Sequence, residues 1–172
     1  MMKSTNIIVV TMLLLFVCEY SSADLIYDTC QKTKYSSLCE STLRANFRMA
    51  TSDVKGLGYY MFETSLNQAI TNNNQISSLI RTTKDPASKK CLSICSVDYK
   101  SIIDNIHLAV VKLNSNAFTE SVSAGNAAIF ADWNCEGSFA NEPTKPQSPI
   151  TGINNVFFQL TTIAINIVQT LK

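Results

Sequence analysis

The sequence predicts an all-α fold: an up-down four-helix bundle that carries a disulfide-stapled helical hairpin at its N-terminus. Apolar residues recur at helical intervals in four long segments, which is the periodicity of core-facing helices. The 172 residues include only five glycines and four prolines, which argues against a disordered or fibrous chain. Hydrophobic residues make up 46% of the sequence, so the chain is long enough for one domain with a core and too short for two.

Residues 1–23 are predicted to be a signal peptide. Lys3 provides a positive start, Ile7–Cys18 forms a short apolar run, and Ser21–Ala23 places small residues where a signal peptidase cleaves. A membrane anchor is the alternative, but a membrane span needs about 20 apolar residues. We therefore expect cleavage after Ala23. Residues 24–172 are then a secreted domain that keeps the five cysteines other than Cys18 in an oxidising compartment.

The N-terminal hairpin is expected over residues 24–47, as two short helices separated by the polar stretch 32–37. Cys30 and Cys39 lie nine residues apart, and a disulfide between them would stabilise this turn by about 2 to 3 kcal/mol in the loop-entropy picture. Short helices are marginal alone because nucleation is costly, so such a link has a structural use. Zinc is the alternative, but the only histidine, His107, is far away in the sequence, so no metal is expected.

The bundle is expected over residues 52–172, with its first helix over 52–81. Ser52 is the expected N-cap, and Asp53 in the first turn is favourable for the helix dipole. Gly56 and Gly58 are interpreted as positions that let a neighbouring backbone come close. Asn72–Asn74 interrupts the apolar pattern and is interpreted as a solvated face of this helix.

The second helix is expected to begin with Asp85 as N-cap and Pro86 in its first turn, and its apolar spacing continues to Leu113. The polar break Asn114–Asn116 is short, so the third helix must run antiparallel to the second. The apolar residues of the third helix are Phe118, Val122, Ile129 and Trp133.

Cysteines lie at the open end of this second hairpin. Cys95 is near the start of the second helix and Cys135 is at the end of the third, where a disulfide can link them. Cys91 lies one turn before Cys95 and shares its face, so either could pair with Cys135. Two disulfides would leave one of the five cysteines unpaired.

An irregular connector is expected after Cys135, because Pro143, Pro146 and Pro149 fall within seven residues. The last helix is expected over Ile153–Leu171, with a regular apolar stripe. A lipid-anchor tail is the alternative for this apolar C-terminus, but asparagine and glutamine residues give the helix a polar second face.

The sequence contains no recognisable catalytic or cofactor motif. The sequence has a single histidine and no serine or cysteine in a nucleophile-elbow motif. No dinucleotide-binding, P-loop or zinc-protease motif is present. Asp98 and Asp104 are not spaced to meet on one helix face, so no acid/base pair is visible. The formal net charge of +1 indicates neither nucleic acid nor an anionic membrane as partner. A braced bundle without a catalytic site is better suited to binding, so we expect no enzyme and no cofactor.

Several motifs together resemble the plant invertase/pectin methylesterase inhibitor family. They are TCQKTKYSSLC, the CSVDY that opens at Cys95, the separation of 40 residues from Cys95 to Cys135, the NCEGSF around Cys135 and the proline-bearing connector. DVKGLG also resembles members labelled invertase inhibitors or related pollen allergens. The resemblance covers the whole mature chain. It implies the disulfides Cys30–Cys39 and Cys95–Cys135 and leaves Cys91, a departure from the four-cysteine pattern, as a free thiol.

The resemblance implies an inhibitor of a cell-wall carbohydrate enzyme. Members that act on pectin methylesterase form a one-to-one complex over the pectin-binding cleft, and the expected contact surface is the solvent side of the helices over 52–81 and 86–113. Members that act on acid invertase present a Pro-Lys-Phe turn, of which Asn116, Ala117 and Phe118 keep only the phenylalanine. The turn lacks the lysine ammonium of the Pro-Lys-Phe turn, and this absence favours pectin methylesterase as the target enzyme. The resemblance of DVKGLG favours invertase as the target. Phe118 has a second interpretation as a residue of the core.

The expected partner is therefore a plant pectin methylesterase, with acid invertase as the alternative and a non-inhibitory structural or allergen-like member as the second alternative. The mature chain is expected to be a monomer that binds no nucleic acid and no membrane. We expect it to be secreted to the apoplast and cell wall, or to reach the vacuole if invertase is its target. Acidic wall pH should affect any complex as carboxylates approach their usual pKa of about 4.

Overall fold

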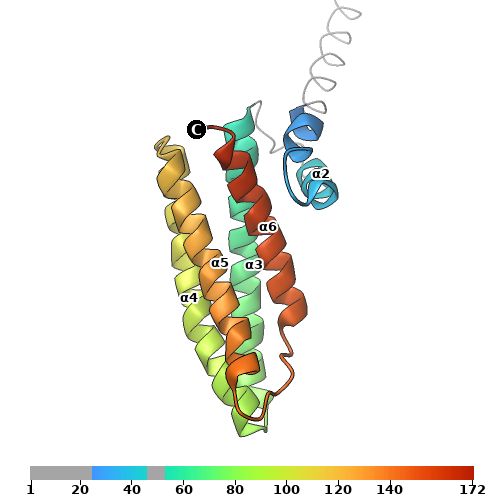
Figure 1. The fold of residues 1–172 in the computed structure, drawn as a ribbon, viewed down its shortest axis with the longest axis vertical. Helices are drawn as coiled ribbons and strands as arrows, with labels where there is room; N and C mark the ends of the chain where they lie inside the picture. The colour runs from blue at the N-terminus through green and yellow to red at the C-terminus, as the bar shows by residue number, and fades with distance from the viewer. Residues whose placement is uncertain (1–24, 46–52) are drawn as a thin grey trace, which may run out of the picture.

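The computed structural model describes residues 25–45 and 53–172, and every described element is a helix, turn or loop. Residues 25–30 and α2, Ser36–Ala45, form the N-terminal hairpin. The four long helices are α3 (Val54–Thr82), α4 (Pro86–Asn114), α5 (Phe118–Asn141) and α6 (Thr151–Gln169). They run side by side along the long axis, with α2 beside the end of the bundle where α6 finishes (Figure 1). The predicted all-α bundle with an N-terminal hairpin is confirmed.

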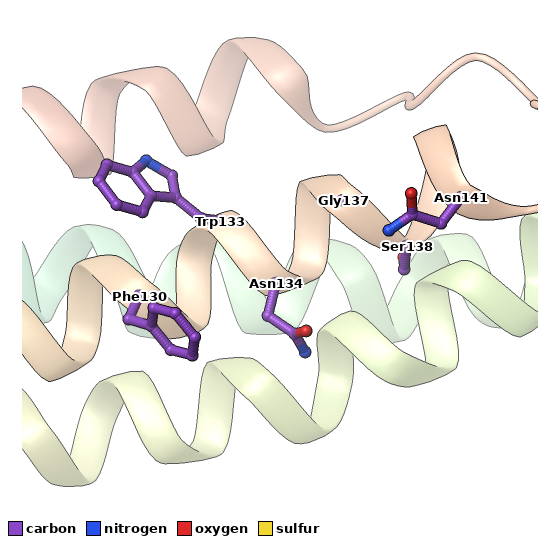
Figure 2. A pocket seen from close by; sticks show the side chains of 6 residues that line it. All are labelled: Phe130, Trp133, Asn134, Gly137, Ser138 and Asn141. Atoms are coloured by element: carbon purple, nitrogen blue, oxygen red, sulfur yellow. The ribbon is translucent and has the colours of Figure 1, made fainter.

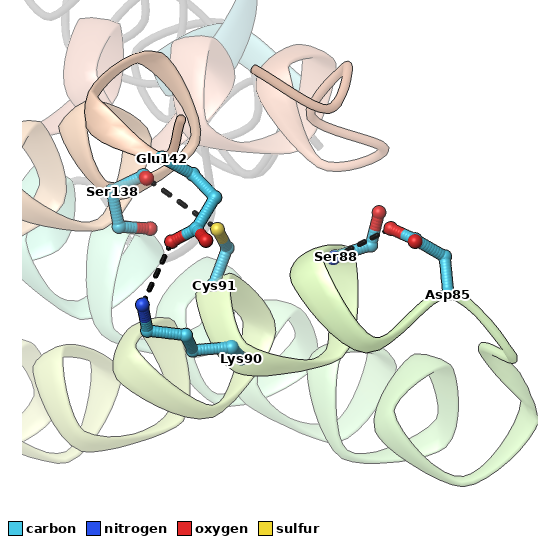
Figure 3. Close-up of polar contacts among 6 residues, drawn as sticks. All are labelled: Asp85, Ser88, Lys90, Cys91, Ser138 and Glu142. Atoms are coloured by element: carbon cyan, nitrogen blue, oxygen red, sulfur yellow. Dashed lines mark hydrogen bonds and ion pairs between the residues drawn. The ribbon is translucent and has the colours of Figure 1, made fainter. Parts of the chain in front are cut away.

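Aspartate residues begin the first two long helices. Asp53 is the N-cap of α3, because its carboxylate accepts a hydrogen bond from the Gly56 backbone N–H at 2.7 Å. The prediction that Asp53 lies inside the first turn is therefore wrong, and the N-cap predicted at Ser52 lies outside the described residues. Asp85 caps α4 as predicted by accepting from the Ser88 N–H at 2.8 Å (Figure 3).

The α4–α5 connection is a tight turn. Asn116 adopts a left-handed backbone with φ 59°, which asparagine tolerates better than most residues. The Ala117 N–H then reaches back to the Lys112 carbonyl at 2.9 Å, which closes the last turn of α4. The two helices consequently run antiparallel, as the short polar break predicts.

The third and fourth helices differ from the predicted bounds. α5 continues through Asn141, two turns beyond Cys135, because no helix-breaking residue occurs before Pro143. The predicted connector was therefore too long, and only residues 142–150 separate α5 from α6. α6 begins at Thr151 rather than at Ile153.

Two glycines set the packing distance between helices. A Cβ added to Gly125 of α5 would lie 2.9 Å from Ile165 Cγ1 of α6, which is closer than real Cβ atoms come. A Cβ added to Gly58 of α3 would lie 2.9 Å from Val168 Cγ2. Gly58 therefore accommodates a side chain of α6, and the prediction that it accommodates a neighbouring backbone is wrong.

The N-terminal hairpin is attached to the bundle through α6. The Lys34 backbone N–H donates to Asn166 Oδ1 at 3.1 Å, and the ring of Tyr35 packs edge-on against Phe158 with centroids 6.4 Å apart. Within the hairpin, Cys30 and Cys39 form a disulfide with a Cα–Cα distance of 5.5 Å. No helix in the described ranges is long and apolar enough to cross a membrane.

Candidate partner-binding surface

A buried polar network joins all four long helices at the end of the bundle that contains the Cys95–Cys135 disulfide. Asn72 of α3 donates its amide N–H groups to Tyr99 Oη at 2.9 Å and to the Ile153 carbonyl at 3.0 Å. Tyr99 in turn donates its hydroxyl to Asn154 Oδ1 at 2.7 Å. Asn72 is fully buried, so the prediction that it lies on a solvated face is wrong: both of its donated hydrogen bonds are made inside the core, where a buried amide needs partners.

Asp132 is the one carboxylate of this network that is almost completely buried, with 3% of its surface exposed. Its nearest polar partner is Tyr99 Oη at 3.5 Å, but the single hydroxyl hydrogen of Tyr99 is already committed to Asn154. Burial, assisted by the nearby charge of Glu136, raises the pKa of Asp132 to about 7. Burial and the charge of Asp132 also raise the pKa of Tyr99 above its usual range.

Glu136 shows why the network is structural. It accepts from Asn154 at 2.7 Å and from Ser148 and Thr151 at 3.0 and 3.1 Å, which ties the connector and the start of α6 to α5. Asn72, Tyr99, Asp132 and Asn154 each have at most 3% of their surface exposed, so a substrate cannot reach them. Among the described residues, no group of three His, Cys, Asp or Glu side chains could hold a metal ion.

The second disulfide lies next to this network. Cys95 and Cys135 are linked with a Cα–Cα distance of 4.5 Å, which fastens α4 to α5. Cys91 is free and buried, and its thiol donates to the Ser138 carbonyl at 3.4 Å (Figure 3). The cysteine pairs in the structure are those that the family resemblance implies.

The predicted contact turn lies at the opposite end of the bundle from the Cys95–Cys135 disulfide. Asn116 is exposed, Ala117 is half-buried, and Phe118 is partly buried against the core. The ammonium of Lys55, on α3, donates to Asn116 Oδ1 at 2.7 Å and to the Asn114 carbonyl at 3.1 Å. Sequence reasoning missed Lys55, because its place at this turn depends on how α3 packs against α4.

The outer side of α4 carries exposed apolar residues. Ile94, Val97, Leu108 and Val111, here called the α4 stripe, expose 37%, 66%, 45% and 60% of their surfaces. Their spacing places them on one face of the helix, opposite the buried face that contains Tyr99 and Ile106. Exposed apolar residues gathered on one face mark interaction sites more often than scattered ones do. This stripe lies on the second of the two helices over which contacts are expected.

A second exposed group lies on α5. Phe130 and Trp133 expose 70% and 59% of their surfaces and project from neighbouring turns of the helix (Figure 2). Trp133, one of the apolar residues in the sequence pattern of this helix, therefore lies on its exposed side rather than in the core. The buried face of α5 is built mainly from small residues such as Gly125 and Ala128, and a hydrophobicity pattern gives these little weight.

Comparison with known proteins gives concordant results. The family model described as plant invertase/pectin methylesterase inhibitor matches residues 24–167. A pectinesterase inhibitor from Actinidia deliciosa is 32% identical over 122 residues, which cover 71% of this chain and 66%, just under two thirds, of that relative. A protein of Platanus acerifolia that carries the name of an invertase inhibitor is 27% identical over 165 residues, or 92% of each chain. The crystal structure of mutant form A of a pectin methylesterase inhibitor from Arabidopsis has a TM-score of 0.72 at 23% identity and covers 83% of this chain and 94% of that one, which shows the shared fold.

Proposed function

This chain is a member of the plant invertase/pectin methylesterase inhibitor family, and from that premise we propose that it inhibits a pectin methylesterase by covering the pectin-binding cleft in a one-to-one complex. The family consists of enzyme inhibitors, so the chain is not an enzyme and acts on pectin methylesterase or invertase as an inhibitor. The choice of pectin methylesterase is supported by the 32% identity to the Actinidia inhibitor and by the absence of a lysine from the turn at Asn116–Phe118.

The α4 stripe is the observation that carries the mechanism. It extends over 18 residues, or about 25 Å of helix, which is long enough to cross an interface of standard size. The Cys95–Cys135 disulfide and the buried network hold α4 rigidly on the bundle, so little conformational entropy is lost on binding. The exposed Ser101 and Asp104 lie between Val97 and Leu108 on the same face, so the α4 stripe consists of two apolar pairs rather than one continuous ridge. A rigid surface of this kind can exclude a polymer from a cleft without any reactive side chain.

The test is an activity assay of purified mature protein against a plant pectin methylesterase and, separately, an acid invertase. We expect inhibition of the esterase. The paired substitution Val97→Asp and Val111→Asp should raise the inhibition constant at least tenfold, because it would bury two unpaired charges at the interface. Val156→Asp places one charge on α6 at a residue that is 41% exposed, and this control should inhibit normally. Esterase inhibition that survives the paired substitution excludes the α4 stripe as the contact surface.

Lys55 favours invertase as the second candidate. Its ammonium lies 2.7 Å from Asn116 Oδ1, so α3 supplies at this turn a positive charge that the turn itself lacks. If this ammonium binds an acidic pocket of invertase, Lys55→Met should abolish invertase inhibition and leave esterase inhibition intact. Inhibition of neither enzyme by the folded protein would support the non-inhibitory alternative.

The proposed setting is the apoplast, with the mature chain acting as a secreted monomer from residue 24 onward. Support comes from the apolar leader over Ile7–Cys18 and from the two disulfides, which persist in oxidising compartments. Mass measurement of the protein recovered from cell-wall washes should give the mass of residues 24–172 less four hydrogens.

A further inference from the structure

The outer surface of α5 and α6 is almost free of charge. Between Ser121 and Asn141 the only charged residues are Asp132, which is buried, and Glu136, which the connector and Asn154 occupy. α6 contains no charged residue at all. Amides, hydroxyls and aromatic rings therefore make up the exposed polar and apolar groups of this side of the bundle.

A shallow cavity of about 270 Å³ lies on this surface. The residues that line it are Phe130, Trp133, Asn134, Gly137, Ser138 and Asn141 (Figure 2). Gly137 leaves space in it, because the nearest atom to a Cβ added there would be Asn141 Nδ2, at 3.8 Å. The volume lies just below the range of about 300 to 1,000 Å³ that is typical of ligand pockets, so it suits a single small ring.

The aromatic side of the cavity is held in place from behind. The indole ring of Trp133 packs on Phe158 of α6 with centroids 6.0 Å apart, and Phe158 packs on Tyr35 of the N-terminal hairpin. This series of rings fixes an exposed tryptophan that would otherwise sample several rotamers. Little side-chain entropy remains to be lost when a ligand stacks on it.

The polar side of the cavity has unused hydrogen-bonding groups. Asn134 donates its amide N–H groups to both carboxylate oxygens of Asp98, at 3.0 and 2.9 Å, which orients the amide and leaves its carbonyl oxygen available. Within residues 25–45 and 53–172, no residue pairs with the side-chain amide of Asn141 or with the indole N–H of Trp133. The carbonyl oxygen of Asn134, the side-chain amide of Asn141 and the indole N–H of Trp133 therefore remain available to bind a ligand in the cavity.

The charged groups near the cavity are already paired. Asp98 is occupied by Asn134, and Glu142 forms an ion pair with Lys90 at 2.9 Å (Figure 3). No cation lines the cavity, so nothing there attracts an anionic polymer. Exposed Phe130 and Trp133 would also suit a protein partner, since aromatic residues are enriched at interface centres, so the test includes that outcome.

From this geometry we propose that the cavity binds a neutral pyranose unit of an oligosaccharide. The apolar C–H face of the sugar stacks on the exposed ring of Trp133, which lies on the other side of α5 from Phe130 (Figure 2), while hydroxyls of the oligosaccharide exchange hydrogen bonds with Asn134 and Asn141. Aromatic platforms with nearby amides suit sugars because a pyranose has one face of C–H groups and a rim of hydroxyls. This site is separate from the α4 stripe and does not depend on inhibition of either enzyme.

The test uses the fact that Trp133 is the only tryptophan in the chain, so intrinsic tryptophan fluorescence reports on this site alone. Titration of the mature protein with cellohexaose should give a saturable change in that fluorescence, with a dissociation constant in the millimolar range. A fully methyl-esterified galacturonan oligomer should bind comparably, and the same oligomer with free carboxylates should bind at least tenfold more weakly. Equal binding of both forms would overturn the preference for neutral sugars.

Variants separate a sugar site from other uses of the surface. In ligand-observed NMR, Trp133→Ala should weaken cellohexaose binding at least tenfold and Trp133→Phe by no more than threefold, while Ile70→Ala on α3 should leave it unchanged. Because the Trp133 side chain is 59% exposed, the fold should tolerate both substitutions. Absence of saturable binding overturns the proposal, and so does binding that survives Trp133→Ala. Loss of enzyme inhibition in Trp133→Ala without any sugar binding would assign the surface to a protein partner instead.

Discussion

Asp132→Asn should remove most of the pH dependence of stability between pH 4 and 7. Asp132 has 3% of its surface exposed, and its pKa is raised from 3.8 to about 7. Across this window the folded chain holds one proton that the unfolded chain has lost, so the free energy of unfolding falls as the pH rises. The protein should therefore be most stable at acidic pH.

The size of this change in stability follows from the shift in the pKa of Asp132. A pKa difference of about three units corresponds to an upper limit of about 4 kcal/mol, so we expect wild type to lose about 2 to 4 kcal/mol of stability between pH 4 and pH 8 through this residue. When protonated, Asp132 can donate to a lone pair of Tyr99 Oη, whose own hydrogen goes to Asn154. The asparagine amide can make the same donation at every pH.

The groups that face this site come from all four helices. Glu136 on α5 is the charged neighbour and Tyr99 on α4 the titratable one, whereas α3 and α6 contribute the neutral amides of Asn72 and Asn154. Because Glu136 is the only further carboxylate in the network, removal of the Asp132 charge should also relieve repulsion above pH 7.

The assay is urea unfolding followed by far-UV circular dichroism at pH 5 and pH 8. Asp132→Asn should exceed wild type by about 1 to 2 kcal/mol at pH 5, because that pH already lies above the unfolded pKa of 3.8, and by about 2 to 4 kcal/mol at pH 8, equivalent to roughly 5 to 15 °C in Tm. Asp104→Asn, at an exposed position on α4, is the matched control and should change stability by less than about 0.5 kcal/mol at either pH. An Asp132→Asn protein that is less stable than wild type at pH 8 would refute the reasoning.

Three further predictions concern packing and cysteines. Gly125→Ala should destabilise the bundle by about 1 to 3 kcal/mol, because the added Cβ would overlap a side chain of α6. Gly152→Ala should be neutral or stabilising, because no atom lies within 4 Å of the added Cβ. Thermal melts that rank the two variants the other way would contradict this account of the packing. Replacement of Cys95 and Cys135 together by serine should cost about 3 to 4 kcal/mol in denaturant unfolding, and a loss below about 1 kcal/mol would show that the α4–α5 link is dispensable. Titration with a thiol reagent should detect one thiol, at Cys91, only after unfolding, and rapid labelling of the native protein would contradict its burial.

Helix periodicity predicted the fold well because the bundle core is periodic. Most apolar residues of the second and last helices, such as Tyr99 and Leu160, face the core as their spacing requires, whereas the α4 stripe and Val156 are exposed. α5 is the exception: its core face is made mainly of small residues, and Trp133, one of the large apolar residues in its pattern, is exposed. Cys91 and Cys95 were equivalent by spacing, and only the family resemblance distinguished them.

The parts that the sequence could not predict depend on long-range partners. Asn72 lies in a polar triplet and gives no local sign that its amide donates to the hydroxyl of Tyr99 and the carbonyl of Ile153. Lys55 is 59 residues from Asn114, whose carbonyl it binds. The α4 stripe could have been found from its apolar spacing on the side opposite the core, which is a pattern that a soluble helix normally avoids.

The central claim is that a rigid surface, and no reactive side chain, produces the effect of this protein by keeping pectin out of an enzyme. The most direct measurement is steady-state kinetics of pectin methylesterase over a range of pectin concentrations at several fixed inhibitor concentrations. If the inhibitor competes with pectin for the cleft, the apparent KM should rise linearly with inhibitor concentration while kcat stays constant. A fall in kcat at constant KM would contradict the claim, because pectin would then enter the cleft while the inhibitor is bound.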